Sequence, residues 1–130
     1  MNVGLLIISH DGIGPALLGT ATFMLNSCPL RTKLLAASRD SDPDELIAEA
    51  AELIRLLDEG DGVLILTDLY GSTPSNIARH LVKQANIRII TGLNLSMLIR
   101  VLNYPDLDLD GLAGKALSGG RDGVVLIEDQ

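Results

Sequence analysis

Aromatic residues are almost missing from this chain of 130 residues, which has one Phe, two Tyr and no Trp. Hydrophobic residues nevertheless make up 47% of the sequence, so the core must be built from aliphatic side chains. Cysteine is equally scarce, because Cys28 is the only one. A single cysteine excludes an intramolecular disulfide and any metal site made from a cluster of cysteines.

Positive charge is also in short supply, since 10 Lys and Arg against 17 Asp and Glu give a net charge of −7. The basic residues are scattered, whereas a nucleic-acid partner demands a basic face, so no nucleic-acid binding is expected. No apolar run reaches the roughly 18–20 residues needed to span a bilayer. The apolar start, residues 1–9, lacks a basic region and is too short for a signal peptide, so the expected location is cytoplasmic. The length fits a single domain, residues 1–130.

Short apolar runs alternate with segments of helical pattern along the chain. Runs such as Val3–Ile8 are typical of strands buried on both faces of a parallel sheet. Strands are expected at residues 3–8, 34–37, 63–67, 87–91 and 124–128, and helices at residues 15–26, 43–59, 73–84, 95–102 and 107–117. This alternation predicts an α/β fold with a doubly wound, mostly parallel sheet and helices on both faces.

Capping residues and glycines mark several of the expected boundaries. Asp42 followed by Pro43 predicts a helix start, Gly60 closes that segment, and Asn94 can cap the helix that begins at residue 95. The glycine-rich segment Gly119–Gly123 is expected to be a flexible connector to the last strand.

Two loops at the carboxyl ends of strands carry candidate chemistry. The first strand ends in Ser-His-Asp-Gly, with His10, and the third is followed by Asp68. In a sheet wound this way the two strand ends are neighbours, so we expect an Asp68 oxygen within about 3.2 Å of His10 Nδ1. A carboxylate there fixes the tautomer and leaves the other ring nitrogen free to attack. Asp11 is the rival acid, and His80 is expected on a solvated helix face.

The turn Gly71-Ser72-Thr73 leads directly into an expected helix. Backbone N–H groups at a helix start, with the helix dipole behind them, form an anion site. A nucleophilic imidazole, an orienting acid and an anion site are together what a phosphohistidine needs. This chemistry calls for no cofactor and no metal ion. Taken singly, a His after a strand, such as His10, is more often a loop hydrogen-bonder than a nucleophile. An Asp there, such as Asp68, is commonly a turn former, and Ser72 and Thr73 also fit simple helix caps.

The sequence resembles the IIA component of the mannose-type (mannose, fructose or sorbose) bacterial phosphotransferase system over nearly its whole length. The resemblance rests on the His that ends the first strand and on three motifs: Asp-Leu-Tyr-Gly-Ser-Thr-Pro-Ser-Asn at 68–76, Gly-Leu-Asn-Leu-Ser-Met-Leu at 92–98, and Gly-Arg-Asp-Gly at 120–123. Two positions depart from the family pattern, because Ser72 stands where many members have Gly and Ser75 where many have Phe.

The resemblance implies a phosphotransferase component with a phosphohistidine intermediate. His10 would accept the phosphoryl group from the HPr-like carrier and pass it to a IIB domain or a regulatory protein, with Asp68 orienting it and Thr73 near the phosphate. The implied fold is a doubly wound sheet of four parallel strands plus one antiparallel edge strand, with helices on both faces. The implied assembly is a homodimer that exchanges the last strand, with membrane contact only through a IIC/IID complex.

Three other interpretations are open at this stage. A receiver-like signalling domain would be phosphorylated on Asp68, but it would require a pair of acids after the first strand and a Lys after the last. A small-molecule binding module would hold a phosphate at Gly12-Ile13-Gly14, a fragment short of a dinucleotide fingerprint. The phosphotransfer subunit of dihydroxyacetone kinase also uses a His after the first strand.

Overall fold

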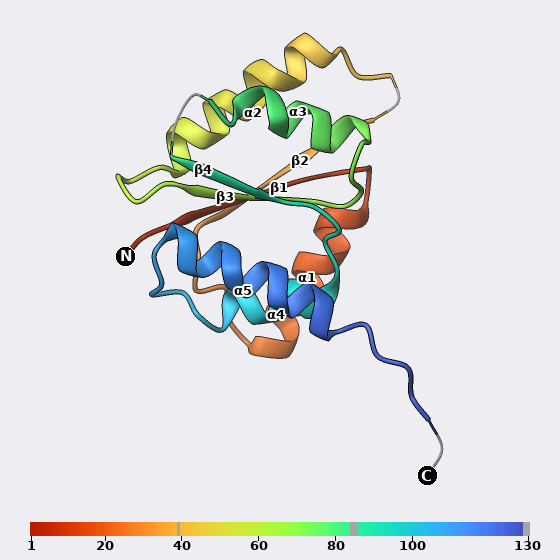
Figure 1. The fold of residues 1–130 in the computed structure, drawn as a ribbon. Coiled ribbons are helices and arrows are strands. Elements are labelled where there is room, and N and C mark those ends of the chain that lie inside the picture. Colours follow the sequence, from red (N-terminus) through yellow and green to blue (C-terminus); the bar gives the residue numbers. More distant parts are fainter. Residues whose placement is uncertain (39, 84–85, 129–130) are drawn as a thin grey trace.

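The computed structural model describes residues 1–38, 40–83 and 86–128. Strands and helices alternate through most of the chain, and two helices follow the last strand (Figure 1). The elements are β1 (Gly4–Ser9), α1 (Ile13–Leu25), β2 (Thr32–Ala36), α2 (Pro43–Leu57), β3 (Val63–Thr67), α3 (Thr73–Leu81), β4 (Ile87–Ile90), α4 (Leu95–Leu102) and α5 (Leu109–Asp122). The predicted alternation is therefore confirmed. Gln84, near which the third helix was expected to end, lies outside the described residues.

The four strands form one parallel sheet in the order β2-β1-β3-β4. Every residue of β1 and of β3 is buried, as their continuous apolar runs predicted. Ile8 of β1 pairs with Thr67 of β3, so the two strands end side by side. This register brings the segments that follow β1 and β3 to the same edge of the sheet.

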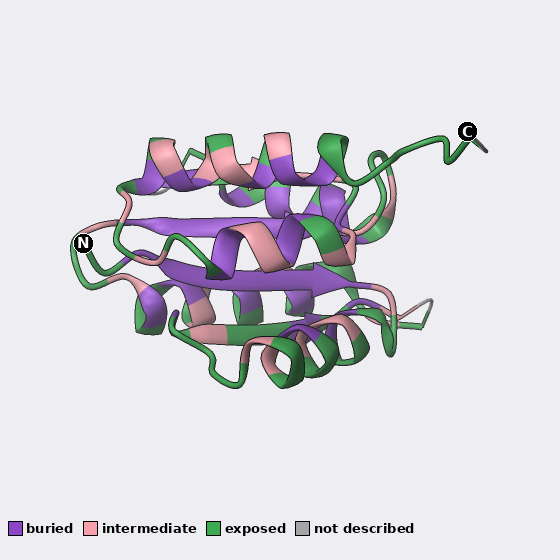
Figure 2. Cartoon of the chain, turned by 90° about the horizontal axis from the view of Figure 1, so that it is seen from below, coloured by how far each residue is buried: buried purple, intermediate pink, exposed green. Residues whose placement is uncertain are grey.

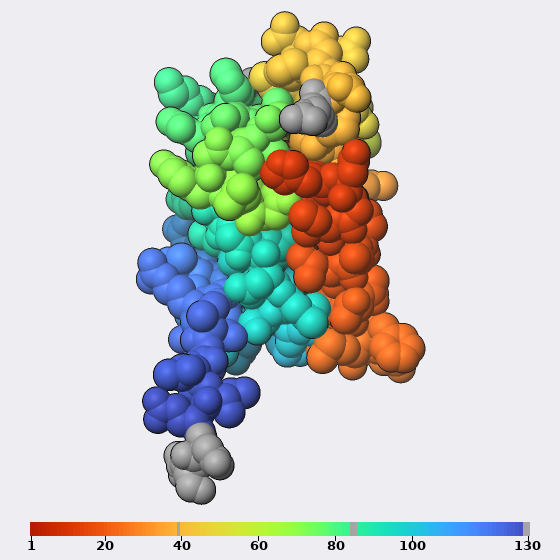
Figure 3. All heavy atoms as spheres, turned by 90° about the vertical axis from the view of Figure 1, so that its right-hand side faces the viewer, coloured from red at the N-terminus to blue at the C-terminus, as the bar shows by residue number. Residues whose placement is uncertain are grey.

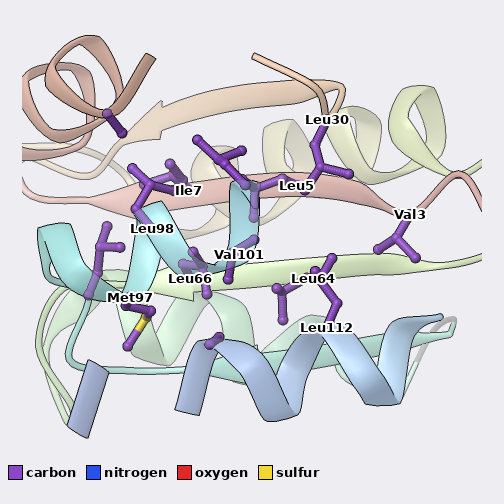
Figure 4. Packing of buried hydrophobic residues seen from close by; sticks show 14 of the residues in the cluster. Val3, Leu5, Ile7, Leu30, Leu64, Leu66, Met97, Leu98, Val101 and Leu112 are labelled. Carbon is purple, nitrogen blue, oxygen red and sulfur yellow. The ribbon is translucent and has the colours of Figure 1, made fainter. Parts of the chain in front are cut away.

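Helices cover both faces of the sheet, with α2 and α3 on one side and α1, α4 and α5 on the other (Figure 1). Successive β1 side chains alternate between two cores, with Leu5 and Ile7 packing toward α4 and α5 (Figure 4), and Leu6 and Ile8 toward α2 and α3. Figure 2 shows the buried strands between helices whose outer faces are exposed. Each fully buried Leu or Ile contributes about 1.5–3 kcal/mol to stability, and this aliphatic core positions the loops at its edge.

Local sequence signals explain where several helices start. Asp42 accepts a hydrogen bond from Asp44 N at 3.0 Å, with Pro43 as the first helical residue of α2. Asn94 accepts from Met97 N at 2.8 Å and caps α4, as predicted. No helix in residues 1–38, 40–83 or 86–128 is long and apolar enough to cross a membrane.

The expected connector at residues 119–123 is wrong, because α5 continues through it to Asp122. Close packing against α4 explains the difference. A Cβ built on Gly119 would lie 2.7 Å from Cβ of Arg100, and one built on Gly120 would lie 2.8 Å from Cε of Met97. The glycines therefore permit two helices to approach each other, and they do not serve as a hinge.

The antiparallel edge strand expected at Val124–Glu128 is also absent from the sheet of this single chain, which holds four parallel strands among the described residues. Because α5 extends to Asp122, the segment after it leaves the helical layer and points away from the sheet (Figure 1). Its four apolar side chains, Val124 to Ile127, are between 69% and 91% exposed. We refer to residues 124–128 as the C-terminal arm.

Candidate functional site

His10 and Asp68 meet at the carboxyl edge of the sheet. They are 58 positions apart in the sequence, yet Nδ1 of His10 lies 2.8 Å from Oδ2 of Asp68. The same carboxylate oxygen accepts the backbone N–H of His10 at 3.0 Å. The predicted distance is confirmed, and the contact follows from the neighbouring positions of β1 and β3.

Burial differs sharply between the two side chains. The imidazole is 45% exposed, whereas the carboxylate is only 8% exposed. Burial works to raise the pKa of the Asp68 carboxyl, but the hydrogen bonds from the His10 backbone and ring, with the charge of the ring, outweigh it and lower the pKa. Asp68 is therefore ionised at neutral pH and accepts hydrogen bonds only.

An ionised Asp68 decides the tautomer of a neutral His10. Because the carboxylate can only accept, Nδ1 must carry the proton and donate it. The lone pair of the neutral ring then lies on Nε2. The site thus presents a half-exposed imidazole whose nucleophilic nitrogen is the one turned away from the acid.

The segment after β3 forms the predicted turn into α3. Gly71 has φ 81°, in the left-handed region that favours glycine, and Ser72 is the N-cap of α3 with an extended backbone. The Ser72 hydroxyl donates to the carbonyl of Leu69 at 2.6 Å and makes no capping bond. Thr73 is exposed in the first turn. Figure 3 shows this yellow-green segment beside the red segment that follows β1, on the same face of the molecule.

The remaining candidates are Asp11, His80 and the segment at 12–14. Asp11 is exposed, and the acid that contacts Nδ1 is Asp68. His80 is exposed in the last turn of α3, at the end opposite the Gly71–Thr73 turn. The Gly14 N–H donates to Ser9 Oγ at 2.9 Å. One N–H of the alternative phosphate site at 12–14 is therefore already used within the protein. Within the described ranges there is no group of three or more His, Cys, Asp or Glu side chains that could hold a metal ion.

Ser9 directly precedes His10 and was not singled out in the sequence analysis. Ser9 is the last residue of β1 and is 1% exposed. Its hydroxyl donates one hydrogen bond, to the His10 carbonyl, and accepts another, from the Gly14 N–H. The only signal for it in the sequence is one hydroxyl residue at the end of an apolar run, directly before His10.

Comparisons with a family model and with curated proteins point to the same family. The family model described as "PTS system fructose IIA component" matches residues 4–109. The mannose-specific EIIAB component of the phosphotransferase system from Escherichia coli K12 is 30% identical over 127 residues, which is 95% of this chain. The chain spans only 39% of the length of that relative.

Solved structures show the same fold. The mannose/sorbose-specific IIA subunit from Enterococcus faecalis has a TM-score of 0.88 at 23% identity, with 100% of this chain and 98% of that chain covered. The IIA protein associated with the fucose utilization operon of Streptococcus pneumoniae has a TM-score of 0.75 at 25% identity, with 91% and 90% covered. Since the family model matches most of the chain, this protein belongs to the mannose-type (EIIA-man) family of IIA components of the phosphotransferase system.

Proposed function

We propose that the chain is a phosphocarrier that accepts a phosphoryl group on Nε2 of His10 from an HPr-like protein. It then passes the group to a IIB domain or to a regulatory protein. The observation that carries this proposal is the 2.8 Å contact between His10 Nδ1 and Asp68 Oδ2, which leaves Nε2 as the nucleophile. Family membership supports the same chemistry.

The proposed transfer needs no cofactor, because one bond to phosphorus forms as another breaks. The Nε2 lone pair forms a bond to phosphorus while the bond from phosphorus to the donor's imidazole nitrogen breaks, and that electron pair returns to the donor ring. His10 keeps its Nδ1 proton, so its ring gains positive charge as the new bond forms. The buried Asp68 carboxylate at 2.8 Å stabilises this charge, as a preorganised group does in a transition state.

The turn before α3 supplies the proposed binding site for the phosphoryl oxygens. N–H groups in the first turn of a helix lack acceptors within the helix and favour an anion. Gly71, Ser72 and Thr73 stand at this start, with Thr73 exposed. The Ser72 N–H already donates to the Leu69 carbonyl at 3.3 Å, so the proposed role of holding the oxygens while Nε2 attacks falls to the Gly71 and Thr73 N–H groups.

Phosphorylation of purified variants tests the proposal. The chain is incubated with phosphoenolpyruvate, enzyme I and HPr, and the label is followed by mass spectrometry. His10→Ala is expected to abolish labelling while the circular dichroism spectrum stays unchanged. His80→Ala is the matched control and is expected to label at the wild-type rate, because His80 is an exposed histidine on α3.

The chemistry of the label separates the alternatives. A phosphohistidine is lost in acid but survives in alkali, whereas an aspartyl phosphate, expected for a receiver-like domain on Asp68, is hydrolysed in alkali. Labelling of the His10→Ala protein, or a label that alkali removes, would contradict the proposal.

We also propose that the chain works as a homodimer in which the C-terminal arm pairs with the sheet edge of its partner. Among the residues that the structure describes, β4 is an edge strand in the order β2-β1-β3-β4, and no strand pairs with its outer side. The arm has four exposed apolar residues in a row, Val124 to Ile127. Any contact with the membrane would come through a IIC/IID complex.

A further inference from the structure

Ser9 lies at the junction between β1 and the loop that carries His10. Its side chain is buried, with 1% exposed. The hydroxyl donates to the carbonyl oxygen of His10 at 2.9 Å and accepts the backbone N–H of Gly14 at 2.9 Å. One side chain therefore ties the reactive residue to the first turn of α1.

The start of α1 depends on this hydroxyl. Gly12 is the N-cap and has φ 84°, and a glycine has no side chain with which to cap the helix. Ser9 Oγ takes the place of a capping side chain by accepting from Gly14 N, from outside the helix. Gly14 leaves the space for it, since a Cβ built there would lie 2.9 Å from Ser9 Oγ.

The backbone of His10 is consequently held at both of its polar groups. Its N–H donates to Asp68 Oδ2 at 3.0 Å. Its carbonyl oxygen accepts from Ser9 Oγ at 2.9 Å and from Ile13 N at 3.3 Å. The direction of the Cα–Cβ bond follows from the backbone, so these bonds set where the imidazole can lie.

We propose that Ser9 is a positioning residue for phosphoryl transfer, whose buried hydroxyl locks the turn from His10 to Gly14 so that Nδ1 stays on Asp68 and Nε2 stays presented to the donor. The expected effect of Ser9 on the rate of phosphoryl transfer rests on the proposed function. The expected effect of Ser9 on the position and tautomer of the His10 ring rests on the geometry alone. A misplacement of about 1 Å in a reacting group costs on the order of 10²-fold in rate.

A pair of variants matched in shape tests the hydroxyl. Ser9→Thr keeps a hydroxyl, and Ser9→Val replaces it with a methyl group on the same branched skeleton. We expect Ser9→Thr to keep the wild-type 15N shifts of the His10 ring and the wild-type labelling rate. We expect Ser9→Val to lose the predominance of the Nδ1–H tautomer and to be phosphorylated about 10–100-fold more slowly.

Thr22→Ala is the control for a general loss of stability. It also removes a hydroxyl that donates to a backbone carbonyl of α1, that of Leu18 at 2.9 Å, away from His10. We expect it to leave the ring signals and the rate unchanged. All rates are measured well below each variant's Tm.

Two results would overturn the proposal. One is a Ser9→Val protein whose ring signals and rate equal those of Ser9→Thr. The other is a Ser9→Ala protein with a lowered Tm but the wild-type tautomer and rate, which would make Ser9 purely structural. If the wild type takes no label, the proposed function fails, and the 15N signals still decide whether Ser9 positions the ring.

Discussion

A neutral imidazole has one nitrogen that donates a hydrogen bond and one that accepts, so the partner of the first decides what the second can do. At His10 that partner is a carboxylate with 8% of its side chain exposed, which also holds the backbone N–H of the same residue. Two bonds to one oxygen restrain both the ring and the main chain. The proposed reaction at Nε2 would therefore begin from a ring that is already held in place.

Replacement of the acid is expected to slow transfer without preventing it. Asp68→Asn keeps the size of the side chain, but its amide can also donate to Nδ1 and so favour the wrong tautomer. Groups that orient or move a proton are worth about 10²–10⁴-fold in rate, and we expect a loss in this range in single-turnover phosphorylation by HPr.

Asp11→Asn is the matched control, because Asp11 is an exposed acid next to His10 in the sequence. We expect it to retain nearly the wild-type rate. If Asp68→Asn were phosphorylated at nearly the wild-type rate and Asp11→Asn were slow, the orienting acid would be Asp11 and the assignment to Asp68 would be wrong.

The same contact predicts how stability changes with pH. The pKa of Asp68 is lowered in the folded chain from its ordinary value of 3.8, so the unfolded chain binds more protons in the range just below that value. The stabilisation is therefore complete above about pH 4 and is lost as the pH falls through the folded pKa.

Urea unfolding of the wild type and of Asp68→Asn at several pH values checks the sign. The difference in the free energy of unfolding should be largest near neutral pH and should shrink in acid below pH 3.8. A difference that grows as the pH falls would contradict the assigned direction.

At the scale of elements, short-range signals predicted most of the architecture. The runs that became β1 and β3 are apolar throughout, and caps such as Asn94 mark a helix start within a few residues. Parallel strands end at a common edge, which is why the proximity of His10 and Asp68 was predictable from the sequence.

The features that the sequence analysis predicted wrongly or missed are set by tertiary contacts. Glycine disfavours helix, so the segment at 119–123 was predicted to be a connector, but α4 lies too close for larger side chains there. Ser9 was missed for the same reason, since nothing in the sequence says that its hydroxyl reaches Gly14.

Two glycines of α5 should respond oppositely to the same substitution. Gly119→Ala places a methyl group 2.7 Å from Cβ of Arg100, which has no freedom to move without its helix, so we expect destabilisation by about 1–3 kcal/mol. Gly114 is exposed and has nothing within 4 Å of an added Cβ, so Gly114→Ala should stabilise by about 0.4–1 kcal/mol. Chemical denaturation measures both values. Equal effects of the two substitutions would show that close packing does not keep Gly119 small.

At the scale of the whole molecule, the C-terminal arm is the feature that a lone chain leaves unsatisfied. Val124, Val125, Leu126 and Ile127 are 79%, 69%, 80% and 91% exposed, whereas the four-residue strand β4 at the sheet edge is partly buried. An exposed apolar segment and a sheet edge without a pairing strand among the described residues are each an aggregation hazard. Pairing one with the other across a twofold axis removes both hazards, and the contact is then made twice.

Removal of the arm is therefore expected to convert a dimer into a monomer or an insoluble chain. Because α5 is helical to Asp122, the informative cut falls after Gly123, which keeps the helix and its contacts with α4 intact. Sedimentation equilibrium at micromolar concentration should give a dimer for the full chain, and also for a chain cut after Glu128, which retains all four apolar residues. In the full chain, Val125→Lys should weaken the dimer, since a charge would then enter the pairing. A monomeric full-length chain, or a stable dimer that survives the cut after Gly123, would rule out exchange of the arm.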